Sequence, residues 1–329
     1  MWRGWRVTRP TDASATHNRV EFVTDLTDAV LMPGDVTIDV DHSSINYKDG
    51  LALTGRPGIV REPVLLAGVD LVGVVAASDS PDWAPGDRVL VNGCGLGETH
   101  HGGLAERARV NSDWLVSVPD AISQRRAAAI GTAGFTAMLA VLELERAGVS
   151  GDILVTGAAG GVGSIAIALL ARLGHRVTAS TGRVEEHDYL RSLGAAEIID
   201  RAELAGRGKP LQSQRWDGAI DTVGGETLAN VLARVRYGGT VAACGNAQSS
   251  ESTVSLMPFI LRAVTLAGIN SVNTPQPLRL ESWGRLAHDL DLDLLDSLTA
   301  SIPLADAGAT AEAIVAGRVR GRTVVDVRG

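Results

Sequence analysis

The pattern of hydrophobic and polar positions divides the chain into a β-rich first third and a longer region in which strands alternate with helices. Residues 36–40 alternate between apolar and polar side chains, as a half-buried strand does, and 69–76 and 88–91 are further strand-like runs. Glycine and proline separate these runs, as in the turn at 85–87. Because the strands are short and divided by turn residues, the first third predicts a small, irregular β-barrel.

From about residue 124 the period of the pattern becomes helical. Residues 125–147 are rich in Ala and Leu and predict a helix that the segment 131–134 interrupts. Further helices are expected over 164–173, ending before Gly174, and over 189–193. Short apolar strands are predicted at 152–156, 176–179, 197–199, 218–221 and 239–243. Since such strands are buried on both faces, the region predicts an α/β fold with a doubly wound parallel sheet of the Rossmann type.

The rest of the chain is less regular. After about residue 271 the pattern predicts two helical stretches and a last strand at 323–327. We expect this strand to return to the first domain, because it has no partner in the alternating region. The polar segment 201–215 contains two glycines and a proline, and it predicts a surface excursion.

Composition and charge narrow the class of protein. The chain has 329 residues, of which 45% are hydrophobic, which suits about two domains with apolar cores. Its net charge of −8 makes nucleic acid a poor partner, because nucleic-acid binding needs clustered Lys and Arg. Cys94 and Cys244 lie far apart and predict no disulfide framework. The basic N-terminus lacks the apolar segment of a signal peptide, and no run of about 18 apolar residues predicts a membrane span, so we expect a cytoplasmic protein.

The strongest motif is the glycine-rich segment 157–163, which follows a predicted strand and opens a predicted helix. Glycines in this position let the backbone approach a pyrophosphate, whose charge the helix N-terminus stabilises. Ala158 stands where the G-x-G-x-x-G pattern has a glycine, and a tight turn between strand and helix is the alternative interpretation. With strand and helix on either side, the segment predicts a dinucleotide site.

The end of the second strand of this region indicates which nicotinamide cofactor binds. NAD sites usually have an acid there, about 20 residues after the glycines, for the ribose 2′-hydroxyl. This chain has Thr181, Gly182 and Arg183 instead, and a hydroxyl and a guanidinium suit the 2′-phosphate of NADPH. NADPH is therefore the predicted cofactor, with a solvated loop arginine as the alternative. Glu185 and Glu186 are expected in the first turn of the next helix.

A zinc site is not predicted. A structural zinc site needs about four Cys or His at short spacings, and this chain has two isolated cysteines. His100 and His101 lie near Cys94, so a three-ligand site is conceivable. Neighbouring histidines usually point apart, however, and we expect no metal and two cysteines that act as small hydrophobic residues.

Several longer segments carry a family resemblance. They are 44–51, 130–138, 221–224, 237–239, 257–262 and 321–323. They resemble the YhdH-type acrylyl-CoA reductases, a zinc-free, quinone-oxidoreductase-like branch of the medium-chain dehydrogenases/reductases. The resemblance implies a GroES-like catalytic domain at 1–124 and 271–329 and a Rossmann NADPH-binding domain at 125–270. It also implies a homodimer, paired through 265–269, that reduces the C=C bond of acryloyl-CoA with NADPH to give propanoyl-CoA.

The resemblance further assigns roles to individual residues. Those that correspond to cofactor-binding positions are Tyr47, Thr132, Gly160, Gly161, Val162, Gly163, Thr181, Gly182, Arg183 and Arg322. Within this set the segment 160–163 is the pyrophosphate loop, 181–183 the 2′-phosphate clamp, and Arg322 the late arginine that reaches the cofactor phosphates.

Tyr47 and Asp49 are the candidate catalytic residues. Hydride delivery to the β-carbon puts negative charge on the carbonyl oxygen before a proton reaches the α-carbon, and Tyr47 can donate a hydrogen bond to that oxygen. The alternative is that Tyr47 only packs on the ribose. Asp49 has a structural alternative as well, in which it holds Lys48 or caps the following helix. Water is an equally acceptable proton donor.

Some features leave alternatives open. The segment 93–101 departs from the family, which more often has Trp and Asn there, and this bears on the size of the acyl pocket. We hypothesise that Arg56 or Arg61 meets the 3′-phosphate of CoA, with solvated surface arginines as the alternative. The competing functions are an NADPH-dependent quinone or enone reductase of the same fold and a non-catalytic NADPH-binding redox sensor.

Overall fold

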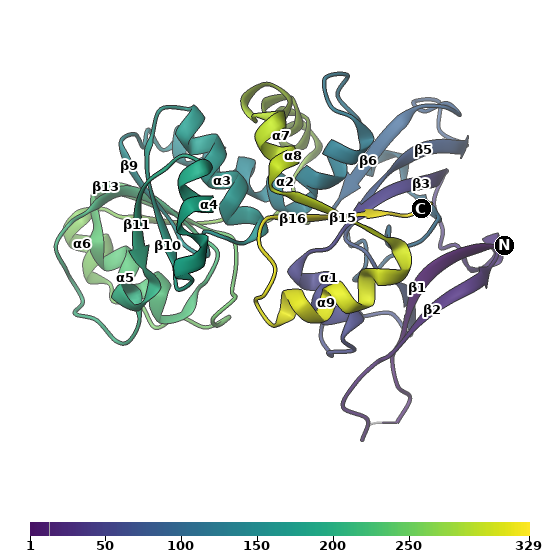
Figure 1. Ribbon diagram of the computed structural model, residues 1–329, viewed down its shortest axis with the longest axis horizontal. Coiled ribbons are helices and arrows are strands. Elements are labelled where there is room, and N and C mark those ends of the chain that lie inside the picture. Colours follow the sequence, from purple (N-terminus) through teal and green to yellow (C-terminus); the bar gives the residue numbers. More distant parts are fainter. Residues whose placement is uncertain (13) are drawn as a thin grey trace. The chain divides into compact units, whose positions relative to one another are not determined.

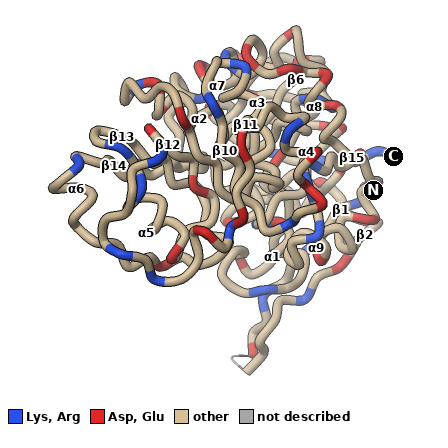
Figure 2. The backbone as a smooth tube through the Cα atoms, turned by 60° about the vertical axis from the view of Figure 1, so that its left-hand side comes forward, with Lys and Arg blue, Asp and Glu red and all other residues tan. Residues whose placement is uncertain are grey.

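A computed structural model describes residues 1–12 and 14–329 of the chain (Figure 1). The chain forms two compact units. Unit 1 consists of residues 1–132, 271–287 and 295–329, and unit 2 of residues 133–270 and 288–294. Acidic and basic positions are interspersed along the chain (Figure 2).

Unit 1 is built on a mostly antiparallel sheet of seven strands. Its order is β15-β16-β3-β5-β6-β8, and β7 also pairs with β3. The strands are β3 (Val36–Ser44), β5 (Asp70–Ser78), β6 (Arg88–Asn92), β7 (Arg107–Val110), β8 (Val116–Ser117), β15 (Thr299–Pro303) and β16 (Arg322–Asp326). As expected, the last strand returns to the first part of the chain, since β16 pairs antiparallel with β3.

A smaller antiparallel sheet and several helices complete unit 1. The sheet has the order β2-β1-β4, with β1 (Trp2–Thr8), β2 (Arg19–Leu26) and β4 (Val64–Leu66). The helices are α1 (Tyr47–Leu53), the first part of α2 (Gln124–Arg146), α7 (Gln276–Asp289), part of α8 (Leu292–Ser297) and α9 (Ala307–Val315). The alternating apolar positions of β3 point into the core, where Val36, Ile38 and Val40 are fully buried.

Unit 2 contains a fully parallel six-stranded sheet in the order β11-β10-β9-β12-β13-β14. The strands are β9 (Asp152–Val155), β10 (Arg176–Thr181), β11 (Ala195–Asp200), β12 (Trp216–Asp221), β13 (Val235–Ala243) and β14 (Thr265–Gly268). The first strand lies in the middle and the order reverses beside it, which is the topology of a Rossmann fold and confirms the predicted fold class.

Helices connect most of the strands of unit 2, since parallel neighbours need a crossover segment between them. They are α3 (Gly161–Arg172), α4 (His187–Ser192), α5 (Gly225–Arg234) and α6 (Met257–Arg262), together with the second part of α2. Helix α3 packs against β9, β10 and β11, and α5 packs against β12 and β13. Because ligands of such folds bind beyond the carboxyl ends of the strands, the segments that follow β9, β10 and β12 are the ones that matter for function.

Helix α2 is interrupted where the glycines predicted it. Gly131 has φ 48° and ψ −160°, which is not helical. A side chain at this position would also clash, because a Cβ would lie 2.5 Å from Asp70 Oδ2 and 2.8 Å from Arg322 Nη2. The kink therefore needs glycine for two reasons. Its backbone conformation is one that glycine adopts readily, and a side chain would collide with the polar groups of Asp70 and Arg322.

The same helix bears on the expectation that no segment spans a membrane. By length and composition α2 is apolar enough to cross a membrane, although no uninterrupted apolar run marks it. The apolar window includes near-neutral Gly and Thr residues, which interrupt the run without lowering its mean hydropathy much. Within the protein, 89% of that window is buried, as in the core helix of a folded domain.

Three local expectations also differ from the structure. Strand β15 was not predicted, because its side chains are mostly exposed and lack an apolar face. Glu185 and Glu186 lie in a 3-10 turn, Val184–Glu186, that precedes α4, rather than in the helix itself. The excursion 201–215 begins with a 3-10 turn, Arg201–Leu204, in which Leu204 is fully buried, so only the later part is a surface segment.

Candidate functional site

The glycine-rich segment of unit 2 has the geometry of a phosphate-binding turn. Gly157 follows β9 with φ 58°, and a Cβ there would overlap the hydroxyl of Thr222. Gly160 is the N-cap of α3, and its N–H bonds back to the carbonyl of Gly157 at 2.9 Å. A Cβ on Gly163 would lie 2.5 Å from the Gly157 carbonyl oxygen. The segment thus brings the start of α3 directly against the turn, with the helix N-terminus at the carboxyl edge of the sheet.

The neighbouring strand β12 holds this turn in place. The Thr156 hydroxyl donates to Asp221 Oδ1 at 2.7 Å, and the Thr222 hydroxyl donates to the Thr156 carbonyl at 3.0 Å. Asp221 Oδ2 accepts from the Gly224 N–H at 2.8 Å. Burial raises the pKa of Asp221, while its hydrogen bonds with Thr156 and with backbone N–H groups lower it. These contacts tie together the segments that follow β9 and β12.

The segment after β10 has no acidic side chain at 181–183. Thr181 ends the strand and is nearly buried, and its hydroxyl accepts from the Arg183 N–H at 3.2 Å. Arg183 Nη1 lies 3.4 Å from Oε1 of the buried Glu186. Gly182 is exposed and faces the side chain of Arg201, which follows the adjacent strand β11. The structure therefore brings the three predicted residues together and adds two charged ones, Glu186 and Arg201.

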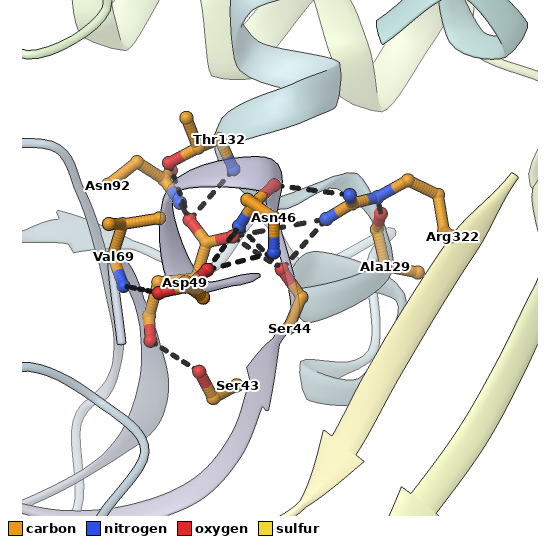
Figure 3. A network of polar contacts seen from close by, with 10 residues as sticks. Ser43, Ser44, Asn46, Asp49, Val69, Asn92, Ala129, Thr132 and Arg322 are labelled. Carbon is orange, nitrogen blue, oxygen red and sulfur yellow. Dashed lines mark hydrogen bonds and ion pairs between the residues drawn. The ribbon is translucent and has the colours of Figure 1, made fainter. Parts of the chain in front are cut away.

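In unit 1, polar side chains that include Ser44, Asn46, Asn92 and Thr132 gather in one network (Figure 3). They converge on Asp70, which is fully buried at the start of β5. Its Oδ1 accepts from Asn92 Nδ2 at 2.6 Å and from the N–H and hydroxyl of Thr132 at 2.8 and 2.7 Å. Its Oδ2 accepts from the Ser44 hydroxyl and from Asn46 Nδ2. A buried carboxylate needs such donors, since an unsolvated charge without partners is strongly unfavourable.

Sequence reasoning missed Asp70. The signal was present, because a lone acid stands at the head of an apolar strand, but the residues that bond to it come from distant parts of the chain. Thr132 was expected to bind the cofactor. In the structure its hydroxyl donates to Asp70, so this proton is engaged within the network.

Arg322, which was expected to reach the cofactor phosphates, lies in the same network. Its Nε donates to the Ala129 carbonyl at 2.6 Å, its Nη2 to the Ser44 hydroxyl at 2.7 Å and its Nη1 to Asn46 Oδ1 at 3.2 Å. The side chain is 2% exposed, and Nη2 lies 3.9 Å from Asp70 Oδ2. Burial lowers the pKa of Arg322, and the nearby carboxylates oppose this shift. The guanidinium is thus a buried counter-charge that joins β16 to β3.

Asp49 is buried and turned toward the backbone (Figure 3). Its Oδ2 accepts from the Asn46 N–H at 2.8 Å in a capping box at the start of α1, and its Oδ1 accepts from the Val69 N–H at 2.9 Å. Burial, and then the charge of Asp70, raise the pKa of Asp49 to about 7. These contacts are those of the structural alternative, in which Asp49 caps the following helix, and the catalytic role stays a prediction.

One alternative from the sequence was that Asp49 holds Lys48, but the two side chains do not pair. The Lys48 ammonium contacts Glu98 Oε1 at 2.6 Å, in the segment 93–101 that departs from the family. The carbonyl of Glu98 also accepts from the Arg61 N–H at 2.8 Å. Tyr47, the first residue of α1, is 41% exposed, and no hydrogen bond of its hydroxyl is recorded among residues 1–12 and 14–329. Its hydroxyl is therefore available to a ligand.

The conceivable zinc ligands are engaged elsewhere. His100 Nε2 bonds to the Arg109 carbonyl at 2.8 Å, and His101 Nε2 bonds to the Val30 carbonyl at 2.9 Å. Burial raises the pKa of the Cys94 thiol. Across the part of the chain that the structure describes, no group of three or more His, Cys, Asp or Glu side chains is arranged to hold a metal ion.

Family models match both parts of the chain. Residues 32–120 match the alcohol dehydrogenase GroES-like domain, and residues 161–283 match the zinc-binding dehydrogenase family.

Individual relatives cover nearly the whole chain. A protein of Escherichia coli named probable acrylyl-CoA reductase AcuI is 50% identical over 93% of this chain and 95% of its own length. Acrylyl-CoA reductase AcuI of Ruegeria pomeroyi is 47% identical over 89% of this chain and 90% of its own. The putative quinone oxidoreductase YhfP of Bacillus subtilis is 44% identical over 89% of this chain and 91% of its own.

Solved structures agree with these likenesses. The YhdH oxidoreductase of Salmonella enterica, in complex with NADP, has a TM-score of 0.95 and 48% identity, and the alignment covers 99% of this chain and 100% of that one. YhfP of Bacillus subtilis, with NAD bound, has a TM-score of 0.93 and 40% identity, with 99% of each chain covered. The chain therefore belongs to the family of the acrylyl-CoA reductases AcuI and YhdH, within the medium-chain dehydrogenases/reductases.

Proposed function

We propose that this protein reduces the C=C bond of acryloyl-CoA with NADPH and releases propanoyl-CoA. The observation that carries the proposal is the likeness to two proteins named acrylyl-CoA reductase AcuI, which extends over almost the full length of each. The Rossmann sheet supports a nicotinamide cofactor, and the buried polar network of unit 1 supports an ordered start of α1 with an exposed Tyr47.

The residues of unit 2 fit NADPH. We propose that the segment 160–163 binds the pyrophosphate at the N-terminus of α3, since the backbone can approach closely only where side chains are absent. Thr181, Gly182 and Arg183 receive the 2′-phosphate, because a hydroxyl and a guanidinium take the place of the acid that would hold a free ribose hydroxyl. When bound, NADPH supplies the hydride for the β-carbon of the substrate.

Around the reacting carbonyl we propose a role for Tyr47. Negative charge develops on the thioester oxygen, and an unengaged phenol at the start of α1 can donate a hydrogen bond to it. Asp49 is a positioning residue in this proposal. It accepts a hydrogen bond from the Asn46 N–H and so fixes the turn that precedes Tyr47. Thr132 and Arg322 likewise serve the site as members of the network around Asp70. The proton for the α-carbon comes from Tyr47 or from water.

For the CoA nucleotide we propose Arg56 and Arg61, whose side chains are exposed on unit 1. Their backbone is anchored, since the Arg61 carbonyl accepts from Arg9 Nη1 at 2.6 Å and its N–H donates to Glu98. A fixed backbone that carries two exposed guanidinium groups suits the 3′-phosphate. Arg56→Ala and Arg61→Ala should raise the KM for acryloyl-CoA, and an unchanged KM in both variants rejects this assignment.

We also propose that the protein is a cytoplasmic homodimer. Strand β14 is an edge strand, paired only with β13 in the described sheet. The preceding helix α6 and its N-cap expose Leu256, Ile260 and Leu261, and Leu266 is exposed on β14 itself. An edge strand beside an exposed apolar surface suits pairing with a second copy.

A quinone or enone reductase is the competing function. The observation that favours it is the likeness to YhfP, which is named a putative quinone oxidoreductase and which has been solved with NAD bound. The two functions share the fold and the hydride donor, so they differ only in the acceptor.

Initial rates of NADPH oxidation separate the two functions. If acryloyl-CoA is the substrate, we expect its kcat/KM to be at least tenfold above the values for crotonoyl-CoA and for a simple quinone, because one extra methyl group typically changes the specificity of an enzyme by about tenfold or more. Turnover of the quinone without turnover of acryloyl-CoA would leave the cofactor assignment standing and reject the acyl-CoA substrate.

A further inference from the structure

Unit 2 has a hollow of about 580 Å³ that the proposed reaction does not use. It is lined by residues 211–215 together with Lys209 and Arg234. We propose that this hollow is a second binding site, which takes a small anion that carries a phosphate or diphosphate group.

The register of β12 and β13 sets the place of the hollow. Trp216 begins β12 and pairs in parallel with Val235, the first residue of β13. The residues before them, Arg215 and Arg234, therefore lie side by side at the amino ends of these strands. The glycine-rich segment follows the carboxyl end of β9 instead. The hollow and the proposed NADPH site thus lie at opposite edges of the same sheet.

Hydrogen bonds hold the lining segment against the end of α5. The Gln212 N–H donates to the Ala233 carbonyl at 2.9 Å, and the Arg215 N–H donates to the Arg234 carbonyl at 2.8 Å. Arg262 Nη1 and Nη2 donate to the carbonyls of Ala233 and Gln212 at 2.9 and 2.7 Å. Carbonyls at the end of a helix repel an anion, but donors already cover these two.

Positive charge gathers at the hollow without matching acids. Arg234 Nε donates to Gln212 Oε1 at 2.8 Å and its Nη2 to the Glu203 carbonyl at 2.9 Å, and both acceptors are neutral. Lys209 is exposed. Within residues 1–12 and 14–329, no ion pair of Lys209, Arg234 or Arg262 is recorded. These three cations therefore have no carboxylate to offset them.

The remaining cation that lines the hollow is already paired. Arg215 contacts Glu197 at 2.8 Å and Glu203 at 3.1 Å, so these two acids are engaged with it. The charge that stays unmatched suits an anion with two or more negative charges better than a single carboxylate. A phosphate group carries about two charges near neutral pH and offers several oxygens to guanidinium and ammonium groups. The volume lies within the range of about 300–1000 Å³ that small-molecule sites have.

The test is calorimetric titration of the full-length, NADPH-saturated protein with inorganic pyrophosphate at constant ionic strength. Saturation with NADPH fills the proposed site at α3, so the probe reports on the hollow. We expect saturable binding to the wild type and a dissociation constant about tenfold or more higher in Lys209→Gln, the effect of losing a charged hydrogen bond. Arg191→Gln is the matched control, because it removes one exposed charge from α4 and should leave this constant unchanged.

Arg234→Gln provides a second variant, which removes the other lining cation that has no acidic partner. It should also raise the dissociation constant for pyrophosphate by about tenfold or more. Because Arg234 holds Gln212 in place, urea unfolding of this variant is measured alongside. The dissociation constant for NADPH should stay unchanged in both variants, since the substitutions alter the opposite edge of the sheet.

Four results would overturn the proposal. The site is rejected if the wild type shows no saturable binding of pyrophosphate, or if Lys209→Gln and Arg234→Gln bind it as the wild type does. An equal loss of affinity in Arg191→Gln would mean that overall charge, and not the hollow, attracts the probe. Binding of acetate, which has one charge, with the affinity of pyrophosphate would reject a phosphate group as the ligand.

Discussion

Asp70 shows how unit 1 keeps a carboxylate away from water. Five donors from four residues surround its two oxygens, and the Arg322 guanidinium supplies a counter-charge 3.9 Å away. Removing one partner of such a pair leaves an uncompensated buried charge, which typically costs about 3–5 kcal/mol of stability. The network therefore fixes the segments around Ser44 and Asn46 and, through them, the start of α1 at Tyr47.

Asp49 should make the stability of the protein depend on pH. Its pKa is about 7 in the folded protein and about 3.9 in the unfolded chain. Between these values the folded state holds a proton that the unfolded state has lost. The stabilisation is thus complete below about pH 4 and disappears as the pH rises through about 7.

This dependence can be measured by urea unfolding of the wild type and Asp49→Asn at a series of pH values. The variant has no carboxyl group at position 49, whether or not the substitution changes its overall stability. Only the wild type therefore shows the change of stability with pH that arises from Asp49. We expect the stability of the wild type relative to the variant to fall between about pH 4 and about pH 7. A constant difference over this range contradicts a raised pKa.

Tyr47→Phe should separate a donor from a packing residue. Loss of a hydrogen bond to the developing oxyanion lowers kcat by about tenfold to a thousandfold, whereas phenylalanine keeps the ring, so a residue that only packs on the cofactor should leave kcat unchanged. Tyr237→Phe is the control, since Tyr237 is a 75% exposed tyrosine at another place in the fold. An unchanged kcat in Tyr47→Phe would assign the tyrosine to packing.

At the scale of the element, the turn between β9 and α3 depends on close backbone contact. Gly163 lies against the Gly157 carbonyl and the Ala158 Cα, so that a Cβ would come within 2.5 and 2.8 Å of them. These are backbone atoms and cannot rotate away as a side chain can. Close packing against this backbone fixes the first turn of α3. A fixed first turn is what lets its N–H groups point toward a bound phosphate.

Gly163→Ala should therefore lower both stability and cofactor affinity. We expect a loss of about 1–3 kcal/mol in the free energy of unfolding, as in overpacked cores, and a higher dissociation constant for NADPH. Gly284→Ala in α7 is the matched control, because no atom lies within 4 Å of its Cβ. Alanine in a helix interior should stabilise that variant by about 0.5–1 kcal/mol. Equal effects of the two substitutions would refute the close-packing argument.

Local pattern was enough to predict the elements that carry the proposed cofactor site. The alternating strands, the helix break at Gly131 and the glycine C-terminal to α3, Gly174, all follow from residues close together in sequence. The partners of Asp70 and the burial of Arg322 could not be predicted in this way. They depend on contacts between β3, β5 and β16, which tertiary pairing alone brings together.

At the scale of the whole molecule, the boundary between the two units falls within α2, just after the Gly131 kink. The chain returns to unit 1 after residue 270, and its last strand β16 pairs with β3. Unit 1 is thus closed by residues from both ends of the chain. Sequence pattern predicted the return of the last strand, but the resemblance to a family was needed to suggest what the molecule does.

The proposed dimer can be tested by sedimentation. With a chain mass of 34.3 kDa, we expect the wild-type protein to sediment with about twice this mass. Ile260→Asp together with Leu261→Asp places charges on the exposed face of α6 and should give a monomer. Leu280→Asp is the control, because it adds one charge at an exposed leucine of α7 and should leave the dimer intact. A wild-type monomer would contradict the proposal.

The central claim is that hydride passes from NADPH to the β-carbon of acryloyl-CoA, and following a deuterium label tests it most directly. The protein is incubated with acryloyl-CoA and with NADPH that carries deuterium at the transferable position, and the product is examined by NMR. We predict propanoyl-CoA with deuterium on its β-carbon, formed in equal amount to the NADPH oxidised. Deuterium on the α-carbon, or no propanoyl-CoA from a preparation that oxidises NADPH with a quinone, would contradict the account.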